Sequence, residues 1–307
     1  MKIFKSKKLK DTESRVLLVR KGEDLSALIP DGKQRQYVEQ RFARDKESAQ
    51  LNLLDHHLFV RRLENGEGTI GRILEEARTA AHAMHASIND LGIKTLVVVN
   101  GGVTQEESIA FAEGLALTNY HFLKYKTGEN KKANALEDIG LLDKGLSDDH
   151  ILKLKNLLDA VYMTRDLVNE PLSYLTAVQL ASEIEQMGKE AGFTVEVFNQ
   201  KKIESLKRGG LLAVNRGSID PPTFSVLTHK PAKASNKKPI ILVGKGVVYD
   251  TGGLSLKPTH DSMDYMKCDM GGAAAVAGAL YAVAKNQFPL WVVGWDSRGR
   301  FIARIGG

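Results

Sequence analysis

The sequence lacks several features that mark secreted or membrane-spanning proteins. It contains one cysteine, Cys268, so no disulfide can form within the chain, which fits a reducing cytoplasm. It has no run of about 20 apolar residues, the length that a membrane-spanning helix needs. Residues Met1–Lys10 are basic but have no apolar core, so we do not expect a secretory signal. We therefore expect a cytoplasmic protein that does not enter a membrane.

The charge of the chain is only mildly positive. Lys and Arg number 43 against 37 Asp and Glu, which gives a formal net charge of +6. Nucleic-acid-binding proteins usually gather basic residues in a patch or interleave them with aromatic residues, and no segment here does so densely. A solvated basic surface explains the charge, so nucleic acid is not indicated as a partner.

A length of 307 residues suggests two domains. Within residues 1–130, Thr69–Leu91 has apolar residues at helical spacing and is expected to be an amphipathic helix. The β-branched run Thr95–Val99 predicts a buried parallel strand, and Thr104 with Glu107 forms a capping box that begins the next helix. This alternation of strands and helices predicts an α/β domain with a largely parallel sheet.

The polar residues 131–150 are expected to be a linker, and residues 151–307 are expected to form a second domain. The patterns there predict helices at 151–167, 176–191 and 271–285. They predict strands at 193–198, 211–214, 223–228, 240–243 and 290–293. We expect the strand at 240–243 to be buried because all its residues are apolar.

The segment Gly244–Gly272 is the most informative part of the chain. It follows a predicted strand and precedes a predicted helix, and ligands of open α/β sheets gather where strands end at their carboxyl edge. Asp250 and Asp269 supply the oxygen ligands that divalent metals need. Gly252 and Gly253 allow the backbone to fold tightly around an ion. These residue types predict a metal site.

Each residue of this segment also has a plainer explanation. Asp269 is equally compatible with the N-cap of the helix that follows. Lys245 could bind phosphate, but its surroundings lack the G-x-x-x-x-G-K-[ST] pattern of a phosphate loop. Lys257 precedes a proline and could be an ordinary surface lysine. Taken singly, these residues do not establish a metal site.

Together, the residues resemble the signature of the leucyl aminopeptidases, which are cytosolic aminopeptidases with two metal ions. The signature combines Gly-Lys-Gly, an aromatic-Asp pair before Gly-Gly, a Ser-x-Lys-Pro segment and Met-Lys-x-Asp-Met. The matching residues are Gly244–Gly246, Tyr249–Gly253, Leu254–Pro258, Met266–Met270 and, upstream, Arg165–Pro171 and Leu211–Ser218. The resemblance covers Leu157–Val293. It implies an N-terminal α/β domain plus an incomplete C-terminal catalytic α/β domain with a central mixed sheet.

The resemblance also implies roles for individual residues. Lys245 and Asp269 would bind one metal ion, and Asp250 would bridge two ions. Lys257 would be the catalytic residue that polarises the scissile carbonyl and stabilises the developing oxyanion, for which it must stay charged. A lysine that binds a metal must instead lose its proton, so the two lysines need opposite charge states. Met266 would line the pocket for the substrate's N-terminal side chain, since a thioether suits a tolerant apolar pocket.

The reaction that the resemblance implies is metal-dependent hydrolysis of the N-terminal bond of a peptide. The complete family site holds two divalent ions, manganese or zinc, which share a water and make it more acidic. Members of the family form hexamers, so a homo-oligomer is expected of a complete protein.

The second half of the family's site is missing from the sequence. Its remaining ligands come from an Asn-Thr-Asp-Ala-Glu-Gly-Arg motif, which does not occur in the 307 residues. We therefore expect a truncated enzyme with at most a partial metal site, inactive or severely impaired. A one-base shift in suitable codons from Asp296 onward yields Ile-Pro-Ala-Ala-Asp-Ser-Ser-Pro-Gly-Ser, which resembles the family's continuation. This indicates a broken reading frame, with no regular structure after the strand that ends at Val293.

Two other functions are compatible with the same sequence. The chain could be a non-catalytic remnant that serves in assembly, or a DNA-binding module, since some members of the family have that role. A metal titration with an aminoacyl chromogenic substrate separates the enzyme from a remnant. Steeply salt-dependent DNA binding would indicate the third function.

Overall fold

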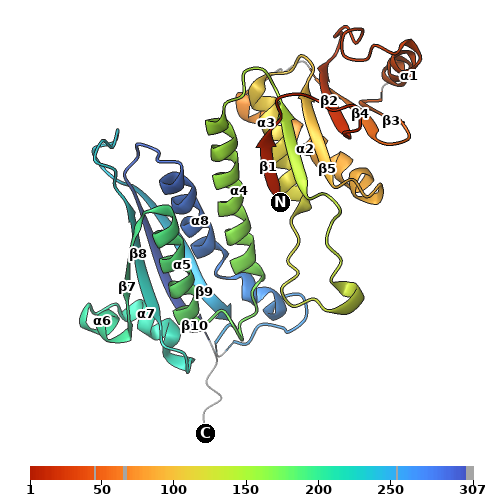
Figure 1. The fold of residues 1–307 in the computed structure, drawn as a ribbon. Coiled ribbons are helices and arrows are strands. Elements are labelled where there is room, and N and C mark those ends of the chain that lie inside the picture. Colours follow the sequence, from red (N-terminus) through yellow and green to blue (C-terminus); the bar gives the residue numbers. More distant parts are fainter. Residues whose placement is uncertain (45, 65–67, 254, 302–307) are drawn as a thin grey trace. The chain divides into compact units, whose positions relative to one another are not determined.

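The computed structural model describes residues 1–44, 46–64, 68–253 and 255–301 (Figure 1). The chain forms two compact units, Met1–Leu158 and Asp159–Gly307. The strands are β1 (Lys2–Lys5), β2 (Arg15–Arg20), β3 (Ser48–Asn52), β4 (His57–Leu63), β5 (Thr95–Asn100), β6 (Asp138–Leu142), β7 (Thr194–Phe198), β8 (Thr223–His229), β9 (Ile240–Asp250) and β10 (Val292–Phe301). The helices are α1 (Gly32–Ala43), α2 (Ile70–Asp90), α3 (Gln105–Asn119), α4 (Asp148–Asn169), α5 (Ala177–Ala191), α6 (Gln200–Ser205), α7 (Gly209–Val214) and α8 (Gly271–Lys285), with 3₁₀ turns η1 (Gly128–Asn130), η2 (Asn215–Gly217) and η3 (Met263–Cys268).

The first unit is built on a sheet with the strand order β1-β6-β5-β2-β4-β3. All neighbouring strands in it run parallel except β3 and β4, which are antiparallel. The prediction of a largely parallel sheet in an α/β domain is confirmed.

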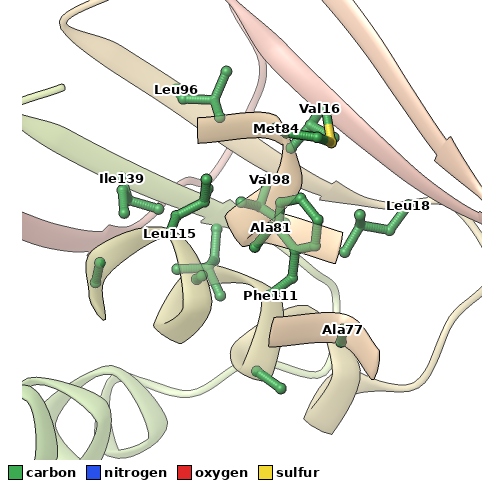
Figure 2. Packing of buried hydrophobic residues seen from close by; sticks show 14 of the residues in the cluster. Val16, Leu18, Ala77, Ala81, Met84, Leu96, Val98, Phe111, Leu115 and Ile139 are labelled. Carbon is green, nitrogen blue, oxygen red and sulfur yellow. The ribbon is translucent and has the colours of Figure 1, made fainter. Parts of the chain in front are cut away.

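The two faces of this sheet carry separate apolar clusters, because side chains alternate along each strand. In β2, Val16 and Leu18 belong to the cluster under α2 and α3, whereas Leu17 and Val19 belong to the cluster on the side of α1. Figure 2 shows the first cluster, in which Phe111 of α3 lies among apolar side chains of α2 and the strands. Phe111 is fully buried, and the burial of such a side chain stabilises the fold by about 1.5–3 kcal/mol.

The polar stretch 131–150, expected to be a linker, instead contains β6. This strand pairs in parallel with both β1 and β5, so it lies within the first sheet. Its residues Ile139 and Leu141 are fully buried. The strand was missed because only two of its side chains enter the core and the flanking residues are charged.

The second unit is built on a sheet with the strand order β7-β8-β10-β9. β9 and β10 are parallel and the other neighbours are antiparallel, which confirms the predicted mixed sheet. Helices α5 and α8 pack together against this sheet (Figure 1). Leu180 and Ile184 of α5 and Ala277 and Leu280 of α8 belong to one apolar cluster with Leu227 of β8.

Strand β9 differs from its prediction in length and in burial. It was expected to end at Val243 and to be buried, but it runs on to Asp250 and is one of the two edge strands among the described residues of this sheet. Ile241 is 48% and Val243 74% exposed. Side chains alternate along the strand, and α8 packs on the face that carries Leu242 and Gly244. Ile241 and Val243 lie on the other face and therefore remain in solvent.

Two further predictions of secondary structure are wrong. Residues 211–214 were expected to be a strand but lie in α7, since a short apolar run does not distinguish a strand from a helix. Regular structure was expected to end at Val293, but β10 continues to Phe301 and pairs with β8 on one side and β9 on the other. Both neighbours would otherwise have unpaired backbone groups along this length. Residues 302–307 of the expected shifted segment lie outside the described residues.

No helix in the described part of the chain combines the length and the apolar character needed to cross a membrane.

The contact between α2 and α3 predicts a test of the first unit's packing. A Cβ atom at Gly114 would lie 2.5 Å from the carbonyl oxygen of Arg78, so Gly114→Ala should push the helices apart and destabilise the unit by about 1–3 kcal/mol. Both tryptophans, Trp291 and Trp295, lie in the second unit. The urea unfolding transition measured by far-UV circular dichroism should therefore move to a lower urea concentration. The transition measured by tryptophan fluorescence should stay in place.

Gly71→Ala is the matched control, because a Cβ atom there meets no atom of the described residues within 4 Å. It should leave stability unchanged or raise it by up to about 1 kcal/mol, as expected from helix propensity. Equal stabilities of the two variants would show that the close approach at Gly114 is not needed.

Candidate active site

The first turn of α8 lies against β9 at the positions of two glycines. A Cβ atom at Gly244 would lie 2.7 Å from the carbonyl oxygen of Gly272, and one at Gly272 would lie 2.8 Å from the amide nitrogen of Lys245. Real Cβ contacts are not this short, so larger residues would force the helix away from the strand. The contact brings Asp269, just before α8, to Lys245 on β9.

A bulge in β9 turns Asp250 toward Lys245. The two residues are five positions apart, and side chains of a regular strand alternate, so they would point to opposite faces. In the pairing with β10, Gly299 pairs with Val247 but Arg300 pairs with Tyr249. β9 therefore has one extra residue at this point, and an extra residue reverses the faces of those that follow. The ammonium of Lys245 acts on the carboxylate of Asp250, as expected of neighbours.

Lys245 and Asp269 form an ion pair. The Nζ atom of Lys245 donates to Oδ1 of Asp269 at 2.7 Å. The Lys245 side chain is 59% exposed, whereas that of Asp269 is 15% exposed. The second oxygen of Asp269, Oδ2, is buried and has no hydrogen-bond partner among the described residues. A buried carboxylate oxygen without a donor is costly, and a cation would relieve that cost.

A tight turn joins Asp250 to Lys257. Gly252 has φ +86°, and a Cβ atom there would lie 2.4 Å from the carbonyl oxygen of Ser255, so only glycine fits. The amide of Gly252 donates to Oδ1 of Asp250 at 2.8 Å, and the Lys257 amide donates to the carbonyl of Thr251 at 2.9 Å. The turn therefore holds both ends of the segment in place. Leu254, part of the matching motif, lies outside the described residues.

Lys257 contacts both Asp250 and Met266. Its Nζ donates to Oδ2 of Asp250 at 3.0 Å and to the sulfur of Met266 at 3.0 Å. The Lys257 and Asp250 side chains are 28% and 22% exposed, so their ion pair is partly shielded from water. The structure thus joins the expected catalytic lysine, bridging acid and pocket methionine in one group.

The environment of Asp250 favours its charged form. Burial alone would raise the pKa of this carboxyl, but the Gly252 amide and the ammonium groups of Lys257 and Lys245 outweigh that effect. The pKa of Asp250 therefore lies below its ordinary value of 3.8.

The alternative explanation of Asp269 as an N-cap does not hold. The N-cap of α8 is Met270, and no side chain of the described residues caps that helix end. Asp269 is instead the residue that ends η3, and its carboxylate points to Lys245. Its side chain is therefore available to bind a cation.

These residues fit part of a metal site. Lys245, Asp250 and Asp269 offer one nitrogen and two carboxylates close to one another. The Oδ2 atom of Asp269, which has no partner in the described part of the chain, is an open ligand position. Within the described part of the chain, no group of three or more His, Cys, Asp and Glu side chains could hold a metal ion. The roles of the individual residues remain predictions.

Lys267 belongs to the matching motif Met266–Met270, but the sequence analysis gave it no role. Its Nζ donates to the carbonyl oxygens of Val168 and Asn169, at 3.2 and 3.3 Å, at the end of α4. A lysine at helix-terminal carbonyls satisfies unpaired acceptors. It thereby ties η3, which carries Met266 and leads into Asp269, to α4. Both segments, Met266–Met270 and Arg165–Pro171, belong to the matching motifs. The sequence does not show that Lys267 of the first contacts the carbonyl groups of the second.

Comparison with known proteins places the same segment in a family. Residues 162–297 match the cytosol aminopeptidase family, catalytic domain. A probable cytosol aminopeptidase from Chlorobium limicola is 38% identical over 250 residues, which are 73% of this chain and 48% of the relative. The chain spans about half the length of the curated relatives it matches.

Solved structures agree with this comparison. A bottromycin maturation enzyme in complex with Mn is 28% identical, with a TM-score of 0.75 over 96% of this chain and 61% of that chain. Tomato leucine aminopeptidase has a TM-score of 0.79 over 100% of this chain and 64% of that chain, at 20% identity. The second likeness concerns the fold alone.

The contacts of Asp250 predict how its pKa responds to a substitution. Lys257→Met removes a neighbouring ammonium, so the effect of burial gains weight and the pKa of Asp250 should rise. A carboxylate ¹³C NMR titration measures this directly. Lys237→Met, at a lysine outside this group, should leave the Asp250 titration unchanged.

The same shift has a consequence for stability. Because the folded pKa is lowered, ionised Asp250 stabilises the fold above its unfolded pKa, and this contribution is lost as the pH falls through the folded value. The Lys257→Met variant should therefore lose less stability than the parent between about pH 5 and about pH 2. An unchanged Asp250 titration in this variant would contradict the ion pair.

Proposed function

Because this chain belongs to the cytosol aminopeptidase family, we propose that it supplies half of the active site of a metal-dependent aminopeptidase. The substrates are peptides, and the reaction releases their N-terminal amino acids. The second half of the site requires a segment with the Asn-Thr-Asp-Ala-Glu-Gly-Arg motif, which the 307 residues do not contain. A polypeptide of these residues alone is therefore proposed to be inactive or severely impaired.

The observation that carries the proposal is the grouping of two acids and two lysines at the end of β9. Lys245 pairs with Asp269, and Lys257 pairs with Asp250. No donor reaches the buried Oδ2 of Asp269 from the residues that the structure describes, which leaves this oxygen available to a cation. A structural ion-pair network would satisfy both oxygens of a buried acid, so this arrangement favours a metal-binding function.

Lys245, Asp250 and Asp269 would hold a divalent cation. Such an ion supplies Lewis acidity, which makes water more acidic and polarises the carbonyl of a peptide bond. Carboxylate and amine ligands accept manganese and zinc alike, and the Mn complex of the bottromycin maturation enzyme favours manganese. To bind the ion through nitrogen, Lys245 must give up its proton and its bond to Asp269.

Lys257 and Met266 would act on the substrate. The ammonium of Lys257 is held at Asp250 and remains 28% exposed, so it can reach the oxygen of a bound peptide. A fixed positive charge there stabilises the negative oxygen that develops during hydrolysis. Met266 touches the same ammonium and brings an apolar side chain to the place where the substrate's first side chain would lie.

We also propose a cellular location and an assembly for this activity. The relatives are named cytosol aminopeptidases, which supports a cytoplasmic location. A homo-oligomer, a hexamer as in the family, is proposed for a protein that contains both halves of the site.

Metal binding tests the role of Asp269. Asp269→Asn removes a charged ligand and should weaken binding of Mn²⁺ or Zn²⁺ to the 307-residue chain at least about tenfold, which corresponds to about 1.4 kcal/mol. Isothermal titration calorimetry measures the affinity and the number of ions. Asp264→Asn is the control, since Asp264 lies in the same turn, is exposed, and is not part of the group. Two tightly bound ions per parent chain would refute a half site.

Activity tests the role of Lys257. The 307-residue chain extended by a family segment with the missing motif should hydrolyse an aminoacyl chromogenic substrate, and the unextended chain should be slower by several orders of magnitude. In the extended form, Lys257→Ala should lower kcat by about 10²- to 10³-fold, the usual effect of removing an oxyanion-stabilising group. Lys237→Ala is the control. A normal rate in the Lys257→Ala variant would exclude that residue from catalysis.

A further inference from the structure

The first unit contains a cavity at the carboxyl ends of three neighbouring parallel strands. β1, β6 and β5 lie side by side in the sheet and run parallel, so all three end at the same edge. The cavity there has a volume of about 820 Å³. Its walls come from residues at the three strand ends and from the start of α4: Lys5, Ser6, Lys7, Val99, Asn100, Leu142, Asp143, Lys144 and Asp148. Ligands of parallel α/β sheets bind at this edge.

The inner polar side chains of the cavity are held by bonds within the protein. Asn100 donates to Oδ2 of Asp143 at 2.5 Å and accepts from the amides of Gly102 and Val103 at 3.0 and 3.1 Å. The other oxygen of Asp143 accepts from the amide of Gly145 at 2.9 Å. These bonds fix the loops that follow β5 and β6. They also occupy the Asp143 carboxylate with donors, which lessens its repulsion of an anion.

The three lysines of the cavity differ in whether their ammonium groups form bonds with the described residues. Lys5 donates to the carbonyl of Leu146 at 2.5 Å. Lys7 and Lys144 are exposed, and neither has a hydrogen bond or an ion pair with any residue the structure describes. The one other acid of the wall, Asp148, lies in the first turn of α4, where a negative charge stabilises the helix. Among the described residues, two lysines of the wall therefore have ammonium groups without a bonded partner, and the three lysines of the wall outnumber its two aspartates.

We propose that this cavity binds a small phosphorylated metabolite, with its phosphate or pyrophosphate group at Lys7 and Lys144. Ammonium groups bind phosphate as point charges, and two of them suit a group with more than one negative charge. The volume falls within the range of about 300–1,000 Å³ that small-molecule sites occupy. The half-buried Val99 and Leu142 give the carbon part of such a ligand an apolar wall. The site lies outside residues 162–297 and does not depend on the proposed aminopeptidase function.

Calorimetry on the 307-residue chain tests the site, with pyrophosphate, ADP and inorganic phosphate as probes. Pyrophosphate or ADP should bind at one site per chain with a Kd below about 1 mM at low salt. The double variant Lys7→Gln, Lys144→Gln should bind at least about tenfold more weakly, because both free cations are gone. The double variant Lys7→Arg, Lys144→Arg keeps both charges and should stay within about threefold of the parent. Since all these side chains are exposed, thermal melting should be the same for every variant.

A matched pair of lysines controls for general surface charge. Lys131 and Lys132 are exposed, lie in the same unit and do not line the cavity, so replacing both by Gln lowers the net charge equally. That variant should bind like the parent. The proposal is overturned if the parent shows no saturable binding, if the Lys7 and Lys144 variant binds normally, or if the control loses affinity equally. It is also overturned if a single-stranded oligonucleotide binds through Lys7 and Lys144 far more tightly than pyrophosphate, since the surface would then serve nucleic acid.

Discussion

The backbone contact between the first turn of α8 and strand β9 is the constraint on which the candidate active site depends. Gly244 and Gly272 allow helix and strand to approach until only hydrogen atoms fit between them. Any side chain at either position would move α8 outward and carry Asp269 away from Lys245. The apolar cluster under α8 adds the energy that holds the helix in place, but the two glycines decide how close it comes. Packing and chemistry are therefore coupled at one point of the fold.

Helices with a regular apolar pattern or clear end signals could be predicted from the sequence. α8 was predicted with its observed bounds, because a run of small apolar residues begins after Asp269-Met270 and ends in Lys285. α5 was one residue shorter than predicted, with Thr176 as its N-cap and Gly192 in the left-handed conformation at its end. Local signals sufficed for these helices because their ends are determined by neighbouring residues in the sequence.

Elements that depend on distant neighbours could not be predicted in the same way. β6 is a strand because β1 and β5 lie on either side of it, and its five residues, between Glu137 and Asp143, are too short a run to predict a strand alone. β10 continues past Val293 because β8 and β9 offer backbone partners there. At the site, the family resemblance was enough to predict that Lys245, Asp250, Lys257 and Asp269 lie together, and their roles as ligands and catalyst stay predictions. It did not reveal the bulge that turns Asp250 toward Lys245, since an extra residue in a strand is defined only against its partner strand.

The pairing of two lysines with two aspartates also determines the net charge of the site. As found, Lys245 balances Asp269 and Lys257 balances Asp250, so the group is neutral as a whole. A divalent ion that displaces the proton of Lys245 would leave this group with one positive charge in excess. Electroneutrality would then favour the entry of an anion together with the metal. With both lysines paired the group carries no net charge, so it would attract an anion less strongly than the metal-loaded group would.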